Sequence, residues 1–371
     1  MMPSRFPCLL VGSSVAAVAL VLLSRLRSEP SPRTIRSPRT TLLPSLSKAE
    51  QEALAYPPDV FPGARDVSSA YGTIRVYEWG PEEGRKVLLI HGISTPCISL
   101  GGIANQLVDR GCRVMLLDLW GRGYSDGIDL PLDSRLYTTE LLLALASSPL
   151  SWTGAGNGFT LIGYSLGGGI SADFATYFPD LVTSLVLLAP AGLIRPSHFG
   201  WQSKLMYSGW IPASLLERIV RRRLQAPAVP STAQKSTQVE NAVNEEVRGA
   251  RDVDFESAPL SKARPGATVG AAVQWQLESH EGFVRAFISS LQHASITGKQ
   301  EVWRMLGLRS DRVMIIAGST DSVIVPAELE VDATAAVGSE HVDFKVIEGG
   351  HEFPITRALE VVDEIERHWT I

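Results

Sequence analysis

The chain has 371 residues, of which 45% are hydrophobic and 20% are charged, and this composition suits one large α/β domain with an insertion. Because 34 basic residues oppose 39 acidic ones, the formal net charge of -5 gives no electrostatic reason to expect nucleic acid as a partner. The three cysteines, Cys8, Cys97 and Cys112, form no C-x-x-C pair and no metal-ligand spacing, which disfavours a disulfide framework and a metal site.

An uncharged segment, residues 6–24, lies between Arg5 and Arg25. As a helix it would measure roughly 28 Å, enough to cross the core of a bilayer. We interpret residues 1–27 as a membrane anchor or targeting segment, with a cleaved signal peptide and a mitochondrial presequence as the alternatives. Basic residues dominate after the segment, so the positive-inside rule predicts a transmembrane helix, in the endoplasmic reticulum, that leaves the bulk of the chain cytosolic.

The next elements follow in a regular order. Residues 28–70 contain SPRT twice and frequent prolines, which predicts a linker. From residue 71 onward, apolar runs typical of buried strands alternate with helical patterns, and this alternation predicts a mostly parallel central sheet flanked by helices. The predicted strands are residues 73–79, 86–92, 112–120, 159–165, 181–190, 312–320 and 342–350. The predicted helices are residues 100–110, 136–146, 166–178, 327–337 and 355–369.

The alternation stops at residues 193–307, which show helical stretches but no clear strand. This segment is too long for a loop within one domain. We therefore predict an inserted helical cap between two parts of an α/β core, residues 71–192 and 308–371. Four aromatic residues near its start fit either an apolar substrate entering beneath the cap or the cap's own core: Phe199, Trp201, Tyr207 and Trp210.

The string GYSLG at residues 163–167 follows an apolar run and precedes a helical pattern, so it predicts a strand-to-helix turn. Glycine at 163 and 167 leaves room for neighbouring backbone in so tight a turn, and Ser165 is expected to adopt a strained conformation. A serine in this context is a candidate nucleophile. The alternative is an unreactive serine in a glycine-rich turn.

A nucleophilic serine needs a base within hydrogen-bond reach, and the base needs an orienting carboxylate. Among the seven histidines, His351 follows the last predicted strand and a pair of glycines, where its side chain can turn toward the carboxyl ends of the strands. We predict it to be the general base. Asp321 follows the preceding strand and is the predicted orienting acid, although aspartate also favours turns for its own sake.

Acyl transfer passes through an oxyanion, so two backbone N–H groups are expected to converge on it. Leu166, directly after the predicted nucleophile, supplies one of them. Ile93, in the loop after the strand that ends in IHG, is the predicted second donor, and Ser94 is the alternative. His91 is interpreted as structural support for this loop.

Together these motifs resemble the α/β-hydrolase superfamily over roughly residues 72–369. The resemblance depends on HG at 91–92, DLWGRGYSD at 118–126, GYSLG, the acid in GSTDSVIVP and GGH at 349–351. It implies a Ser, Asp, His triad in that chain order, a helical cap after the sixth strand, and neither cofactor nor metal. It also makes Asp118 a structural residue. The chain departs from the family after HG, where Ile93-Ser94 stands in place of a second glycine or an aromatic residue.

The sequence therefore predicts a lipase-like serine hydrolase that cleaves a carboxylic ester, or a related acyl bond, of an apolar small molecule through an acyl-enzyme. One alternative is a hydrolase of carbon–carbon bonds in diketone-like substrates. Another is a noncatalytic ligand receptor on the same fold.

Overall fold

The structure, a computed structural model, describes residues 33–154, 156–198, 211–225 and 257–370. The chain divides into two units, residues 1–33 and 34–371, and every element below belongs to the second. None of the helices in the described ranges is long and apolar enough to cross a membrane. This finding corrects the prediction of a transmembrane helix, and the segment that suggested it, residues 6–24, lies outside the described residues.

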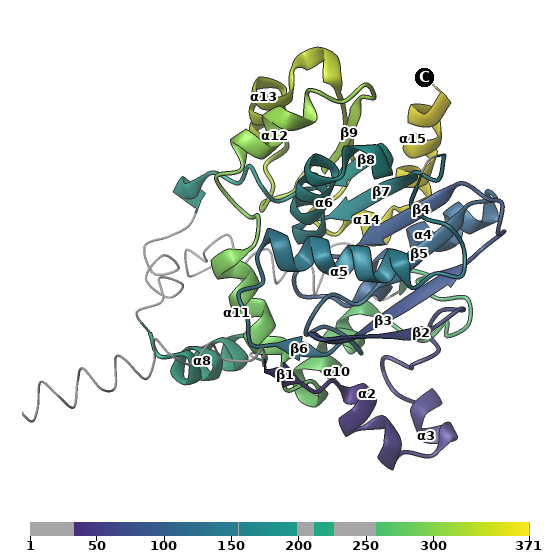
Figure 1. Ribbon diagram of the computed structural model, residues 1–371. Coiled ribbons are helices and arrows are strands. Elements are labelled where there is room, and N and C mark those ends of the chain that lie inside the picture. Colours follow the sequence, from purple (N-terminus) through teal and green to yellow (C-terminus); the bar gives the residue numbers. More distant parts are fainter. Residues whose placement is uncertain (1–32, 155, 199–210, 226–256, 371) are drawn as a thin grey trace, which may run out of the picture. The chain divides into compact units, whose positions relative to one another are not determined.

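An eight-stranded sheet with the order β10-β9-β8-β7-β4-β5-β3-β2 forms the centre of this unit (Figure 1). The strands are β2 (Arg65–Ser69), β3 (Gly72–Trp79), β4 (Lys86–Ile90), β5 (Arg113–Leu117), β7 (Phe159–Tyr164), β8 (Val182–Leu188), β9 (Val313–Gly318) and β10 (Val342–Ile347). Neighbours from β5 to β10 pair in parallel, whereas β3 is antiparallel to β5, and β2 to β3. The predicted mostly parallel sheet is confirmed, and each of the seven predicted strands overlaps an observed one.

Helices cover both faces of the sheet, which is why β7 and β9 are buried at every residue and show no polar alternation. On one face α4 (Gly101–Asp109), α14 (Phe353–Thr356) and α15 (Ala358–Thr370) pack together. On the other face lie α5 (Ser134–Ala146), α6 (Leu166–Tyr177), α12 (Gln300–Leu306) and α13 (Pro326–Val337).

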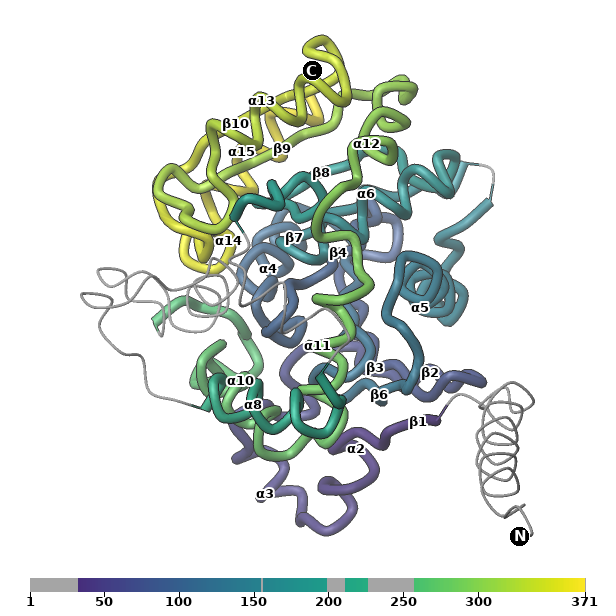
Figure 2. The backbone as a smooth tube through the Cα atoms, turned by 90° about the vertical axis from the view of Figure 1, so that its left-hand side faces the viewer, coloured from purple at the N-terminus to yellow at the C-terminus, as the bar shows by residue number. Residues whose placement is uncertain are grey.

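Three helices of the predicted cap contact one another: α8 (Ala213–Gln225), α10 (Val269–Ser279) and α11 (Phe283–His293) (Figure 2). The sequence also assigned α12 to the cap. In the structure α12 packs on α6 and α13 of the core, with the Trp303 side chain fully buried. The aromatic residues between 199 and 210 lie outside the described residues.

Residues 34–69, predicted as linker, are folded onto the core. They contain β1 (Thr34–Ile35), which pairs with β6 (Gly127–Ile128), as well as α2 (Pro38–Thr41), α3 (Lys48–Glu52) and β2. The serines and prolines that suggested a linker act as helix-start signals: Pro38 lies in the first turn of α2, and Ser47 forms a capping box with Glu50 at α3.

Candidate active site

Ser165 occupies a tight turn between β7 and α6. Its backbone has φ 54° and ψ -117°, a left-handed conformation that non-glycine residues rarely adopt. The Ser165 amide donates to the Leu188 carbonyl over 2.9 Å, and its carbonyl accepts from the amides of Gly168 and Ala191, each over 2.9 Å. These bonds to the helix and to the end of β8 hold the strained conformation, in agreement with the expectation from GYSLG.

Glycine is required on both sides of this turn. A Cβ atom on Gly163 would lie 2.3 Å from the Gly167 carbonyl oxygen, and one on Gly167 would lie 2.1 Å from the Ile90 carbonyl oxygen. The second contact shows that the first turn of α6 lies directly against the end of β4. Ser165 therefore lies next to the loop that follows β4.

The structure brings Ser165, His351 and Asp321 together from three separate loops. Ser165 Oγ lies 3.0 Å from His351 Nε2, and His351 Nδ1 lies 2.7 Å from Asp321 Oδ2. The other carboxylate oxygen of Asp321 accepts the amides of Val323 and Ile324, both over 2.8 Å. Asp321 can thus accept a hydrogen bond from His351 through one oxygen while its second oxygen is also hydrogen-bonded.

The hydrogen bonds of these residues define the state of the imidazole. Because the Asp321 carboxylate only accepts, His351 Nδ1 carries the proton and donates it, and Nε2 is left to accept the Ser165 hydroxyl proton. His351 is fully buried and Asp321 is 4% exposed, whereas Ser165 is 8% exposed. Ser165 is therefore the member of the set that solvent reaches most, and His351 can act on it as a base.

Sequence reasoning missed the part that Tyr164 takes in this site. Its Oη donates to the His351 carbonyl over 3.0 Å, and the two rings lie 5.3 Å apart between centroids. Tyr164 precedes Ser165, so one short stretch of chain contacts both the serine and the histidine. Its position directly before Ser165 in GYSLG could have indicated this role, but the motif G-x-S-x-G does not specify the residue at that position.

The two predicted oxyanion donors on the loop after β4 are both buried: Ile93 is 6% exposed and Ser94 is fully buried. Leu166 begins α6, so its amide has no partner within the helix. His91 accepts the Leu119 amide at Nε2 over 2.9 Å, which leaves Nδ1–H to donate to the Gly92 carbonyl over 2.8 Å. His91 therefore supports the loop, as interpreted, and has no ring nitrogen available to act as a second base.

Asp118 organises the other loop at this edge of the sheet. It is fully buried, and its carboxylate accepts the Tyr56 hydroxyl over 2.9 Å and the amides of Cys97 and Tyr124, each over 3.0 Å. Burial raises the pKa of this carboxyl, and the hydrogen bonds oppose that shift. Asp118 thus joins residues of three segments, which is the structural role expected for it.

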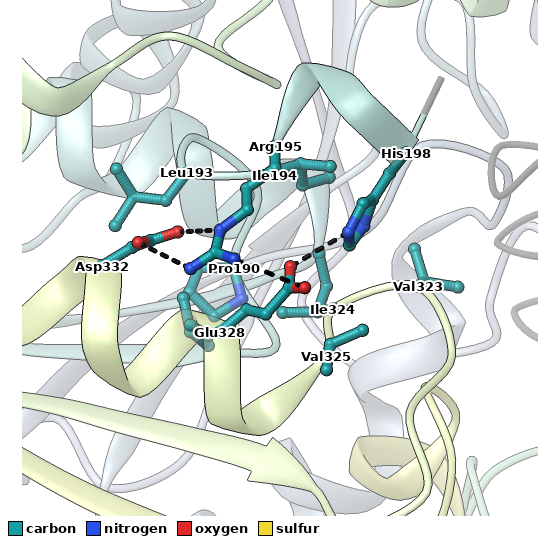
Figure 3. A pocket seen from close by; sticks show the side chains of 11 residues that line it. Pro190, Leu193, Ile194, Arg195, His198, Val323, Ile324, Val325, Glu328 and Asp332 are labelled. Carbon is teal, nitrogen blue, oxygen red and sulfur yellow. Dashed lines mark hydrogen bonds and ion pairs between the residues drawn. The ribbon is translucent and has the colours of Figure 1, made fainter. Parts of the chain in front are cut away.

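The turn after Asp321 lines a small pocket together with the segment that leads into the cap (Figure 3). Arg195 forms a bidentate pair with Asp332 over 2.8 and 3.0 Å. His198 Nε2 lies 3.0 Å from Glu328 Oε2. Both acids belong to α13, so these contacts tie the start of the cap to the helix that follows Asp321.

A larger cavity of about 700 Å³ lies between α8, α11 and residues 128–131. Its apolar lining includes Ile128, Leu130, Pro131, Ile211, Leu216 and Ile288. Arg285 also lines it and pairs with Glu217 over 2.8 Å. In the ranges that the structure covers, no group of three or more His, Cys, Asp or Glu side chains is arranged to hold a metal ion.

Comparisons with known proteins agree with this architecture. Residues 86–358 match a family model described as the alpha/beta hydrolase fold. An uncharacterized protein of Mycobacterium tuberculosis is 24% identical over 312 residues, which cover 82% of both chains. A serine hydrolase-like protein of Dictyostelium discoideum is 29% identical over 140 residues, 36% of this chain and 37% of its own.

A solved bacterial structure, a membrane phospholipase A, is similar with a TM-score of 0.57 at 18% identity and covers 98% of this chain and 97% of its own. At that identity the likeness concerns the fold. The family model covers well over half of the sequence, and its range includes Ser165, Asp321 and His351. The chain therefore belongs to the alpha/beta-hydrolase family.

Proposed function

We propose that this hydrolase is a serine hydrolase that cleaves a carboxylic ester, or a related acyl bond, of an apolar substrate. The observation that carries the proposal is the hydrogen-bonded series from Asp321 through His351 to Ser165, with separations of 2.7 and 3.0 Å. Serine becomes a strong nucleophile when a base takes its proton and a carboxylate stabilises the protonated base. The partial likeness to a serine hydrolase-like protein supports the same reaction class.

In the proposed reaction, His351 Nε2 takes the hydroxyl proton as Ser165 Oγ attacks the acyl carbon. The carbonyl π bond breaks, and its electron pair moves to the oxygen, which becomes the oxyanion. Collapse of this intermediate breaks the bond to the leaving group, which takes the proton from His351. Water then attacks the acyl-enzyme by the same steps, which releases the acid and restores Ser165. Asp321 stabilises the imidazolium in both halves of the reaction.

The oxyanion is proposed to accept the Leu166 amide and an amide of the loop after β4, from Ile93 or Ser94. Two observations support this assignment. The start of α6 lies against the end of β4, so the donors belong to adjacent backbone segments. The helix that begins at Leu166 also places the positive end of its dipole beside Ser165.

An apolar substrate is supported by the aliphatic part of the cavity between α8, α11 and residues 128–131, whose lining also contains charged and polar side chains. A volume of about 700 Å³ is in the range of sites for small molecules. The Arg285–Glu217 pair at its wall is partly exposed, so charged groups lie at the edge of the lining.

Fluorophosphonate labelling tests the nucleophile directly. The wild-type protein is expected to take one label per chain, at Ser165, and the Ser165→Ala variant none. Hydrolysis of p-nitrophenyl esters from acetyl to palmitoyl then tests the reaction and the apolar preference, with medium or long chains expected to give the highest kcat/KM. Ser171→Ala is a suitable control, because Ser171 is buried in the helix that Ser165 precedes, nearly two turns beyond Ser165.

A wild-type protein that is folded but neither takes the label nor hydrolyses any ester above the Ser165→Ala background would overturn the proposal. Labelling without ester turnover would support Ser165 as the nucleophile and contradict the proposal of an ester substrate. Loss of labelling in Ser171→Ala, with labelling kept in Ser165→Ala, would assign the reactive serine elsewhere.

A further inference from the structure

Three consecutive carbonyl groups of the loop after β4 each accept a hydrogen bond from a different buried side chain. The three donors share complete burial but come from three parts of the chain. The pairs are His91 Nδ1 with the Gly92 oxygen at 2.8 Å, Arg122 Nε with the Ile93 oxygen at 3.2 Å, and Gln276 Nε2 with the Ser94 oxygen at 2.5 Å.

These bonds determine where the amides of the loop point. The described chain has no cis peptide bond, and in a planar trans peptide the C=O and the following N–H point in opposite directions. Holding the Gly92 carbonyl therefore aims the Ile93 amide, and holding the Ile93 carbonyl aims the Ser94 amide. Both proposed oxyanion donors of this loop are thus oriented through their carbonyl sides.

Arg122 joins this loop to the cap. Its guanidinium donates to the Trp120 carbonyl over 2.8 Å, to Tyr137 Oη over 3.2 Å and to Ser290 Oγ over 2.7 Å, in addition to Ile93. All of these acceptors are neutral, and Ser290 belongs to α11 of the cap. The buried carboxyl of Glu140 also interacts electrostatically with this guanidinium, which opposes the rise that burial gives the pKa of that carboxyl. The donation from Arg122 to Ile93 polarises that peptide and strengthens the Ser94 N–H as a donor.

Gln276 makes the second connection. It lies on α10 of the cap, and its side-chain amide spans two core loops: Nε2 donates to the Ser94 carbonyl, and Oε1 accepts the Gly123 amide over 3.2 Å. Because a carbonyl needs a donor and an N–H needs an acceptor, this arrangement admits only one orientation of the amide. A cap helix therefore supplies one of the three groups that hold the loop.

We propose that Arg122 and Gln276 are positioning residues of the oxyanion loop, and that the cap thereby takes part in assembling the catalytic centre. Arg122 aims the Ser94 amide through the Ile93 carbonyl, and Gln276 holds the next peptide, Ser94–Thr95, so that Ser94 is fixed on both sides. The inference rests on the proposed function, since only an acyl-transfer reaction forms the oxyanion. It goes further by making turnover depend on side chains of the cap that do not contact the reacting atoms.

The test compares Gln276→Glu and Gln276→Met with Gln274→Glu, which makes the same charge change on the exposed side of α10. Both Gln276 variants lose the neutral donor to Ser94. Their kcat for p-nitrophenyl esters is expected to fall roughly 10- to 100-fold, while KM changes less than about threefold. Gln274→Glu is expected to match the wild type. Inhibition by an aryl trifluoromethyl ketone, which forms an oxyanion adduct with serine, is expected to weaken by the same factor as kcat.

A pH series separates positioning from general damage to the structure. A protonated glutamic acid can donate to Ser94 and accept from Gly123, as glutamine does. The activity of Gln276→Glu, taken as a fraction of wild-type activity at each pH, is therefore expected to rise as the pH falls, while the fraction for Gln276→Met stays constant. If Gln276→Glu does not fold, Gln276→Met and Arg122→Lys supply the kcat and inhibitor comparisons.

Wild-type kcat in both Gln276 variants, or a loss that is confined to KM, would overturn the inference while the Ser165 chemistry stood. A wild-type protein that fails both fluorophosphonate labelling and ester hydrolysis overturns the proposed function, and this inference with it. A fall in kcat that exceeds the change in KM, together with an equal weakening of inhibition by the ketone, supports the inference.

Discussion

Tyr164 Oη donates a hydrogen bond to the carbonyl of His351 over 3.0 Å, so the residue before the proposed nucleophile holds the backbone of the proposed base. The Tyr164 ring is also fully buried and tilted against the imidazole. The contact joins β7 to the loop after β10 across the intervening strands. It makes the distance between Ser165 and His351 depend on a third residue.

Replacing Tyr164 by phenylalanine is therefore expected to slow turnover without abolishing it. The ring contact remains and the hydrogen bond is lost, so we expect the free energy of unfolding to fall by about 1 kcal/mol and kcat by roughly 3- to 10-fold. Urea unfolding and ester kinetics measure the two effects. The control is Tyr177→Phe, whose side chain is 48% exposed. Equal kcat in Tyr164→Phe and the wild type would contradict a positioning role.

Asp321→Asn is expected to lower kcat by roughly 10³- to 10⁴-fold while the fold is retained. An asparagine can still accept the amides of Val323 and Ile324 through its oxygen. Its NH₂ group would then face His351 Nδ1 and favour the tautomer with the proton on Nε2, which cannot accept the Ser165 proton. Steady-state kinetics with a circular dichroism spectrum check this outcome. Asp180→Asn, on the surface before β8, is the matched control; a loss below tenfold in Asp321→Asn would argue against the role.

Much of this site could be predicted because its residues follow local rules. Ser165, Asp321 and His351 each follow the end of a parallel strand, β7, β9 and β10, within about four residues, and the carboxyl ends of parallel strands meet at one edge of a sheet. The part played by Gln276 could not be predicted in this way. Its contacts with Ser94 and Gly123 span more than 150 positions of sequence, and nothing around it distinguishes it from other helical glutamines.

The segment before the sheet shows a second limit of sequence reasoning. Its prolines and serines resembled a linker in composition, yet Tyr56 within it is fully buried and donates to Asp118. Composition describes the average preference of a segment, whereas packing depends on a few large side chains in it. A single aromatic residue that reaches a buried carboxylate can hold such a segment against the core.

Gly167→Ala is expected to abolish the folded active site. The added Cβ would lie 2.1 Å from the Ile90 carbonyl oxygen and 2.6 Å from that of His91, and both are backbone atoms that cannot move away cheaply. We expect destabilisation of at least about 3 kcal/mol, or no soluble protein. Gly266→Ala adds the same atom where nothing lies within 4 Å, and it should match the wild type. Thermal melts of both variants decide the point: similar melting temperatures would show that the turn can relax.

His280 gives the protein a pH-dependent stability. Burial lowers the pKa of this histidine from 6.5 to about 4, and its Nε2 lies 2.8 Å from the Ser125 carbonyl while Nδ1 accepts the Gly282 amide. The unfolded chain therefore binds more protons than the folded protein between pH 4 and 6.5. This contribution to stability is present above pH 6.5 and is lost as the pH falls toward 4, by about 3 kcal/mol in all.

Removing this titration is expected to flatten the pH dependence. Because the glutamine of His280→Gln can still donate to Ser125, the variant should be only somewhat less stable than the wild type at pH 7.5. Because glutamine does not titrate, the variant should lose less free energy of unfolding between pH 6.5 and 4.5. Urea unfolding at four pH values across this range measures the difference in slope. His341→Gln, at a partly exposed histidine, is the control for the substitution itself. If His280→Gln and the wild type lose the same free energy over this range, the acid sensitivity comes from other groups, because only the difference between the two isolates His280.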